Sequence, residues 1–266
     1  IDGLTQPGAS ANTIAFPGGL DTVLQVEVDG GATPAGSHGV VLSGGSSTLR
    51  GLVVNRFQST SYHDGAGVRL SSHGNIVESC FIGTDPTGTS AFGNGGSGVY
   101  IHQSNNQLIG GAAAPARNLI SANGGYGQVY HYGSAVTGGG THLNGNLVGT
   151  DATGTVLLSS NGGFRMYAGA GDSNWVGGPN AGEGNVITGQ VYIEIGTGVM
   201  IQGNRIGTNA AGTATLGSGA GINGSRNSPT MTIGGPQPGA GNILAGGAGI
   251  GVFVRSWDWV VQGNLI

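Results

Sequence analysis

The sequence predicts an all-β solenoid, in which short strands wind into coils stacked along one axis, and three observations favour this fold class. An Ile-Gly-Thr-Asp-x-x-Gly-Thr type of motif occurs three times, at residues 82–89, 148–155 and 206–213. A second motif, a branched residue before Gly-Gly with an asparagine further on, begins at Ile109, Val176 and Ile233. Short apolar runs also recur about 28 to 36 residues apart. Self-similarity at a fixed period is the signature of a solenoid.

The composition supports a folded rod rather than a disordered or fibrous chain. Glycine supplies 59 of 266 residues without a three-residue period, which excludes collagen, and the 37% apolar content indicates a real core. All eight basic residues are arginine and the net charge is −4, so we expect no nucleic-acid partner. No apolar stretch approaches 18 residues, so we expect no membrane insertion. Cys80 is the only cysteine, which rules out an internal disulfide.

The apolar runs have the alternation of strands. In each run the first and third residues are apolar and the middle one varies, as a period of two requires. The clearest runs are Val40–Leu42, Val68–Leu70, Val99–Ile101, Phe164–Met166 and Val191–Ile193. A coil of this length holds roughly three short strands, each paired with its counterpart one coil up at about 4.8 Å. We therefore predict about nine coils in a single domain spanning residues 1–266.

Both ends of the sequence resemble the middle of a repeat. We therefore interpret the chain as an excerpt of a longer one, and unpaired strand edges at its ends would invite end-to-end self-association.

Two series of asparagines recur with the motifs, and we interpret both as structural. Asparagine tolerates left-handed bends, and stacked amides can form a hydrogen-bonded ladder. The first series is Asn146, Asn204 and Asn264, with Cys80 in its earliest position, and the second is Asn118, Asn185 and Asn242.

These repeats resemble those of the right-handed parallel β-helix proteins, the pectin-lyase-like superfamily. More closely, the chain is similar to glycine-rich bacterial proteins, secreted or anchored to the cell surface, that carry Ile-Gly-Thr-Asp-x-x-Gly-Thr repeats. The resemblance covers essentially the whole chain and implies a right-handed parallel β-helix. It does not imply one activity, because the superfamily includes lyases, hydrolases, epimerases, adhesins and tailspikes.

The motif loops raise the question of a metal. Asp85, Asp151 and Asn209 could offer oxygen atoms to calcium, but each loop supplies one such side chain and calcium takes six to eight oxygen ligands. We expect no cofactor and interpret the loops as Asx turns, with Ca²⁺ as the alternative.

One sheet is expected to carry a column of outward side chains. If the flanking apolar residues point inward, the middle residues of successive strands point out. The column is Arg69, Tyr100, Tyr130, Arg165 and Tyr192, although Gln128 makes the register of Tyr130 less clear. Its spacing of about 4.8 Å is close to one sugar residue, tyrosine rings suit sugar faces, and arginine binds carboxylates. We predict glycan binding here, flanked by His102, His131 and Glu194; an ordinary exposed strand face is the alternative.

Catalysis on this face has weaker support. The lyases and hydrolases of the superfamily use clustered acidic residues, whereas the aspartates here are single, among them Asp172, and no Asp-Asp, Gly-His-Gly or Arg-x-Lys element occurs. The candidate catalytic residues are His63, Asp64 and Glu194.

The predicted function is therefore a polysaccharide-binding or adhesive module of a secreted or cell-surface bacterial protein, with a polysaccharide or surface glycan as its partner. A polysaccharide lyase or glycoside hydrolase on the same face is one alternative, and a purely structural spacer is another.

Overall fold

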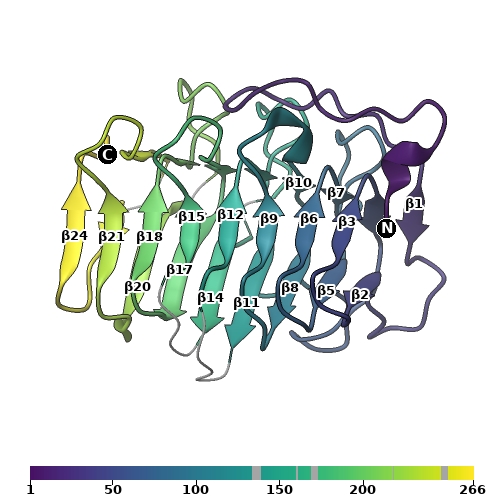
Figure 1. Cartoon of the computed structure of the whole chain (residues 1–266), viewed down its shortest axis with the longest axis horizontal. Helices are drawn as coiled ribbons and strands as arrows, with labels where there is room; N and C mark the ends of the chain where they lie inside the picture. Colours follow the sequence, from purple (N-terminus) through teal and green to yellow (C-terminus); the bar gives the residue numbers. More distant parts are fainter. Residues whose placement is uncertain (134–138, 160, 169–172, 218, 247–250) are drawn as a thin grey trace.

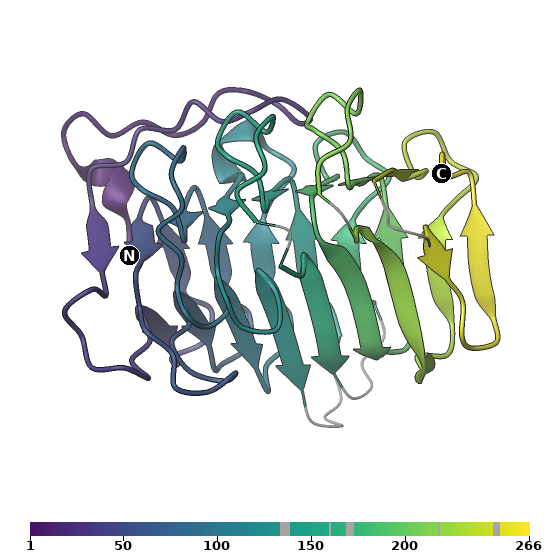
Figure 2. The same ribbon diagram turned by 180° about the vertical axis from the view of Figure 1, so that it is seen from behind.

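The chain forms a right-handed parallel β-helix, shown from two sides in Figures 1 and 2. The computed structural model describes residues 1–133, 139–159, 161–168, 173–217, 219–246 and 251–266. Each coil gives one short strand to each of three parallel sheets, and each strand pairs with its counterparts one coil away. Eight strands per sheet in this part of the chain make about seven turns, fewer than the nine expected. The excess residues lie in an N-terminal arm and in hairpin loops outside the coils.

Sheet 1 consists of very short strands whose outer face is covered. Its order is β1-β4-β7-β10-β13-β16-β19-β22. The strands are β1 (Glu27–Asp29), β4 (Val53–Asn55), β7 (Phe81–Ile82), β10 (Leu119–Ile120), β13 (Leu147–Val148), β16 (Val186–Ile187), β19 (Arg205–Ile206) and β22 (Ile243–Leu244).

Sheet 2 has the longest strands and contains the predicted column. Its order is β2-β5-β8-β11-β14-β17-β20-β23. The strands are β2 (Val40–Leu42), β5 (Val68–Leu70), β8 (Val99–His102), β11 (Val129–Gly133), β14 (Phe164–Ala168), β17 (Gln190–Ile195), β20 (Gly221–Asn227) and β23 (Val252–Phe253).

Sheet 3 completes each coil, and in Figure 1 it faces the viewer from β3 to β24. The strands are β3 (Thr48–Arg50), β6 (Ile76–Glu78), β9 (Leu108–Gly110), β12 (His142–Asn144), β15 (Trp175–Gly177), β18 (Val199–Gln202), β21 (Met231–Gly234) and β24 (Trp259–Gln262). Two short 3₁₀ helices, η1 (Gly3–Thr5) and η2 (Ala114–Ala116), lie outside the sheets.

The core is mainly a stack of branched aliphatic side chains, because the inward positions of one coil lie over the same positions of the next wherever the strands keep register. Val68, Val99 and Val129 form one such column on sheet 2, and all three are fully buried. Burial of such side chains is worth about 1.5–3 kcal/mol each. One coil alone cannot bury this face, so the stacking itself stabilises the fold.

The two asparagine series form one ladder. Each side-chain Nδ2 donates to the Oδ1 of the asparagine one coil further on, at 2.8–3.0 Å, from Asn118 through Asn146 onward. Cys80 begins the ladder, since its backbone N–H donates to Asn118 Oδ1 at 2.9 Å. The structural interpretation is therefore confirmed, and the two series are alternate rungs of the same column. The rungs after Asn146 are Asn185, Asn204, Asn242 and Asn264.

The N-terminal arm, residues 5–26, runs along the outside of sheet 1 and returns, as Figure 1 shows at the top of the molecule. Arg117, fully buried, holds it: the guanidinium donates to the carbonyl oxygens of Ile14, Gly18 and Gly19 at 2.8–3.0 Å. Its Nε donates to Gly145 O at 2.7 Å, which ties the arm to the coils. Burial lowers the pKa of Arg117 to about 10, so the side chain stays charged at neutral pH.

Candidate functional site

The five column residues lie on successive strands of sheet 2, as their spacing predicts. Arg69 pairs with Tyr100 and Tyr100 with Tyr130. Tyr130 pairs with Arg165, and Arg165 with Tyr192. The column therefore crosses five neighbouring strands, β5 to β17. Its role in binding a ligand stays a prediction.

The column is less exposed than we expected, because the loop between β4 and β5 folds over it. Tyr100 and Tyr130 point away from the core but are only 3% exposed. Their rings stack at 5.6 Å with an interplanar angle of 6°, and the imidazole of His63 lies 5.9 and 6.2 Å from them. Burial raises the pKa of Tyr100 to about 12 and that of Tyr130 further, so both phenols stay neutral.

A second outward column lies two residues along the same strands, and the sequence analysis missed most of it. His102 pairs with Tyr132, and Tyr132 with Tyr167. The two tyrosine rings stack at 5.6 Å, and His102 stacks on Tyr132 at 6.0 Å. The period of two that identified Tyr130 and Arg165 also places Tyr132 and Tyr167 outward, so the signal was present.

The expectation for His131 was wrong. It pairs with the inward residues Ile101 and Met166, so it lies in the core and is 2% exposed. The neighbour Val129, rather than Gln128, occupies the inward position opposite Val99. Burial lowers the pKa of His131 to about 4, and its Nε2 lies 3.2 Å from Ser104 O.

A shallow groove of about 200 Å³ opens where the two columns meet. A β-bulge in β17 shifts the register after Ile193, and bulges commonly re-aim a side chain. Here the bulged Glu194 forms an ion pair with Arg165, and Arg165 also lies 4.6 Å over the ring of Tyr126 and 5.1 Å over that of Tyr192. The groove is lined by His63, Tyr126, Tyr130, Tyr132, Arg165, Tyr167 and Glu194.

The candidate catalytic residues separate into two groups. His63 and Glu194 line the groove together. Asp64 instead closes its own loop, since its carboxylate accepts hydrogen bonds from Ser59, Thr60 and Ser61 at 2.6–3.0 Å. These bonds hold the pKa of Asp64 well below its usual range. The Asp64 side chain therefore positions the loop that carries His63, whose Nδ1 lies 3.2 Å from the Tyr100 hydroxyl.

Arg69 lies between two imidazoles. Its guanidinium nitrogens are 3.2 Å from His38 Nε2 and 3.2 Å from His102 Nδ1, and within the described ranges it forms no ion pair. Burial, and then the charge of Arg69, lowers the pKa of both histidines. Each imidazole can therefore stay neutral and accept a hydrogen bond from the arginine.

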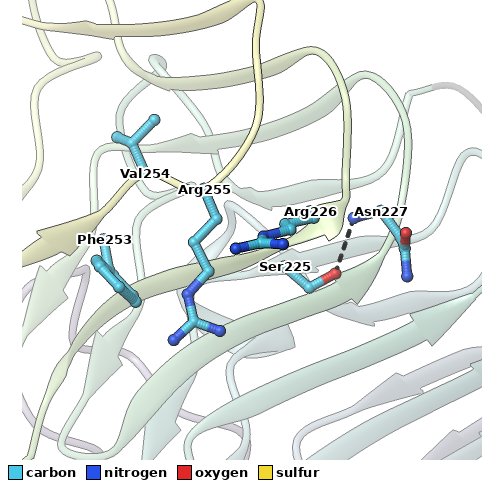
Figure 3. A pocket seen from close by; sticks show the side chains of 6 residues that line it. All are labelled: Ser225, Arg226, Asn227, Phe253, Val254 and Arg255. Atoms are coloured by element: carbon cyan, nitrogen blue, oxygen red, sulfur yellow. Dashed lines mark hydrogen bonds between the residues drawn. The ribbon is translucent and has the colours of Figure 1, made fainter.

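A basic hollow of about 690 Å³ lies further along the same sheet, at the ends of β20 and β23 (Figure 3). Figure 3 shows the side chains of Arg226 and Arg255 extending over it. The Arg255 guanidinium lies 4.2 Å from the Phe253 ring centre, and neither arginine pairs with an acid in the part of the chain that the structure describes. Ser225 lines this hollow and donates to the backbone oxygen of Glu194, so the two hollows are neighbours.

The Gly-Thr-Asp loops are hairpins closed by their own acid or amide. Asp85 accepts from the backbone N–H groups of Thr89 and Ser90 at 2.9 Å, and Asp151 and Asn209 do the same in their loops. Among the described residues, no group of three or more His, Cys, Asp or Glu side chains is arranged to hold a metal. Asp172 lies outside the described residues.

Comparisons with family models, with curated proteins and with solved structures find no match to this chain. Over the described ranges, the structure also contains no helix of the length and apolarity that crossing a membrane requires.

Proposed function

We propose that the groove on sheet 2 binds a polysaccharide, and that the chain is an adhesive or recognition module of a secreted or cell-surface bacterial protein. The observation that carries the proposal is the groove between the two columns, where stacked tyrosines of adjacent strands adjoin the Arg165–Glu194 pair. Strands about 4.8 Å apart repeat such side chains at close to the length of one sugar residue. The Ile-Gly-Thr-Asp repeats support a relationship with the pectin-lyase-like superfamily.

The geometry suits a sugar chain that lies along the coil axis. Tyr132 and Tyr167 present partly exposed rings, which offer apolar area and a hydroxyl at each step. Arg165 and Glu194 supply charged hydrogen-bonding groups beside them. Arg226 and Arg255 extend the same face with positive charge, which favours a chain carrying carboxylate or sulfate groups.

Affinity electrophoresis against acidic and neutral glycans tests the proposal. We expect at least one glycan to retard the protein, and the Tyr132→Ala/Tyr167→Ala variant to lose most of that retardation. Phe92→Ala removes a ring that is 36% exposed elsewhere on the molecule, and it should migrate like the wild type. The absence of retardation by every glycan would refute the proposal.

One observation favours a lyase or hydrolase as a second candidate: an imidazole and a carboxylate line the same groove. Such a pair can move a proton to or from a bound sugar. Incubation with the retarding glycan should then release reducing ends or unsaturated uronates that absorb ultraviolet light. His63→Ala and Glu194→Gln should both abolish that release, and the glycan should still retard His63→Ala, because His63 is not one of the proposed glycan-binding groups. Release by neither wild type nor variants would exclude catalysis on that glycan.

A further inference from the structure

Sheet 3 carries a separate hollow of about 220 Å³ on its outer face, away from the sheet 2 groove. Its floor is the outward column of β12 and β15, where His142 pairs with Trp175 and the rings stack at 6.0 Å with an angle of 8°. Its rim is the connection from β15 to β16. The lining residues are His142, Asn144, Trp175, Gly177, Pro179, Asn180 and Glu183.

The end of β12 leaves a polar atom without a partner at this hollow. Asn144 is 7% exposed, and its Oδ1 accepts no hydrogen bond from the residues that the structure describes. Leaving a buried acceptor unpaired costs about 1–3 kcal/mol, which a ligand that donates a hydrogen bond would recover. This oxygen is itself enclosed, so a donor from outside the chain reaches it only when the Asn144 amide turns toward the hollow.

Glu183 holds a fixed place at the rim. Its carboxylate accepts from the backbone and side-chain nitrogens of Asn180 at 3.0–3.1 Å, and its own carbonyl accepts from Gly145 N at 3.1 Å, next to Asn144. A Cβ at residue 178 would lie 2.2 Å from Glu183 Oε2, so a side chain there would displace the carboxylate from this position. The carboxylate is thus positioned by the loop rather than free in solvent.

The charge of the hollow is negative. Of the lining residues only His142 and Glu183 have ionisable side chains, and burial lowers the pKa of His142 although Glu183 opposes the shift. The imidazole is therefore neutral at pH 7, and the acidic side chain of the lining is that of Glu183. No lysine or arginine lines the hollow. A ligand that brings positive charge and hydrogen-bond donors fits this lining better than an anion or a pure acceptor.

We propose that the hollow formed by His142, Asn144, Trp175 and Glu183 binds a primary ammonium group. In this assignment the ammonium donates to the Glu183 carboxylate and, once the Asn144 amide turns toward the hollow, to Asn144 Oδ1. The carbon body of the ligand packs against Trp175 and Pro179. Charge-assisted hydrogen bonds of this kind are about twice as strong as neutral ones. The site does not depend on the glycan groove, because it lies on another sheet and uses none of the same residues.

Nuclear magnetic resonance of the tryptophan indole N–H groups tests the proposal on the intact chain, with Trp175→Phe used only to assign the signal. Glucosamine should move the Trp175 signal and leave that of Trp257, which is 71% exposed at the last coil, unchanged. N-acetylglucosamine has no ammonium and should bind at least tenfold more weakly. Butylamine separates the two sources of an ammonium: tighter binding than glucosamine indicates an alkylamine, and weaker binding an amino sugar.

Two charge-matched variants complete the test. Glu183→Gln should weaken glucosamine binding at least tenfold, whereas Glu78→Gln, which removes the same charge from β6 on the same sheet, should change it less than twofold. The proposal is overturned if neither amine moves the Trp175 signal, if N-acetylglucosamine binds as well as glucosamine, or if Glu183→Gln binds like the wild type. The comparison of glucosamine with N-acetylglucosamine uses the wild type. It therefore tests the proposal even if a variant fails to fold.

Discussion

The asparagine ladder predicts a large cost for removing one rung from its middle. Asn185 is fully buried, and its Nδ2 donates to Leu143 O at 2.7 Å and to Asn204 Oδ1 at 2.9 Å. Its Oδ1 accepts from both the backbone and side-chain nitrogens of Asn146 at 2.9–3.0 Å. Asn185→Ala removes these four bonds.

The magnitude follows from the groups that lose their partner. Asn146 Nδ2 keeps its bonds to Ile109 O and Asn144 O, and Asn204 Oδ1 keeps the backbone N–H of residue 185. Leu143 O loses the Nδ2 donor and the backbone N–H of Asn146 loses its acceptor. At about 1–3 kcal/mol for a buried N–H left unpaired and about 1 kcal/mol for each of the other hydrogen bonds lost, Asn185→Ala should lower the free energy of unfolding by about 2–6 kcal/mol.

Denaturation in urea, followed by circular dichroism, measures this loss. A fall in the midpoint at constant slope would report stability rather than a change in compactness. Asn227→Ala is the control, because Asn227 is exposed and its side chain makes no ladder contact, and it should change stability by less than about 0.5 kcal/mol. A cost below about 1 kcal/mol for Asn185→Ala would refute the reasoning, since the ladder would then contribute little to the stability of the fold.

Three further predictions concern buried polar groups. Arg117→Met should free the arm, so that hydrogen exchange measured by mass spectrometry is faster at residues 5–22 while the coils stay protected. Unchanged exchange at residues 5–22 would show that Arg117 does not hold the arm. The folded pKa of His131, about 4, lies below the unfolded value of 6.5, so the unfolded state binds more protons as pH falls and stability drops through that window. In the wild type, His131 should make the free energy of unfolding about 3 kcal/mol lower at pH 4 than at pH 7, and His131→Met should remove this contribution. An equal dependence of the free energy of unfolding on pH in both proteins would count against the prediction. Burial raises the pKa of Cys80 to about 12, so the native protein should resist thiol reagents that label the urea-unfolded chain; rapid labelling in buffer would show that the thiol is not enclosed.

The fold was predictable because its determinants repeat along the chain. Alternation at Val68–Leu70 and Val99–Ile101 indicated the strand faces, and the structure pairs these two runs residue for residue. The coil count was too high because dividing the length by the period assigns every residue to a coil. Residues 5–26 form the arm instead. Arg117, about a hundred positions later, holds this arm, and no local pattern in the sequence reveals that contact.

The site was predictable in its alignment but not in its exposure. Period-two alternation placed Tyr100 and Arg165 on one face, because neighbouring coils keep register. It could not show that the loop carrying His63 covers Tyr100, since that contact depends on how a long connection folds. It also could not place Glu194 beside Arg165, because the β-bulge in β17 breaks the alternation at that residue.

The hairpin loops impose a rule on how such a rod can change its length. Ala152 N donates to Gly88 O at 2.9 Å, and Ala210 N donates to Gly154 O at 2.8 Å, so each hairpin rests on the one two coils away. Insertion or deletion of a single coil would change the spacing between successive hairpins, so that one hairpin would no longer lie over the next. Duplication of a two-coil cassette, such as one from the start of β7 to the start of β13, would preserve every one of these contacts. Growth in pairs is therefore the step that this architecture tolerates, in natural lineages and in engineered extensions alike.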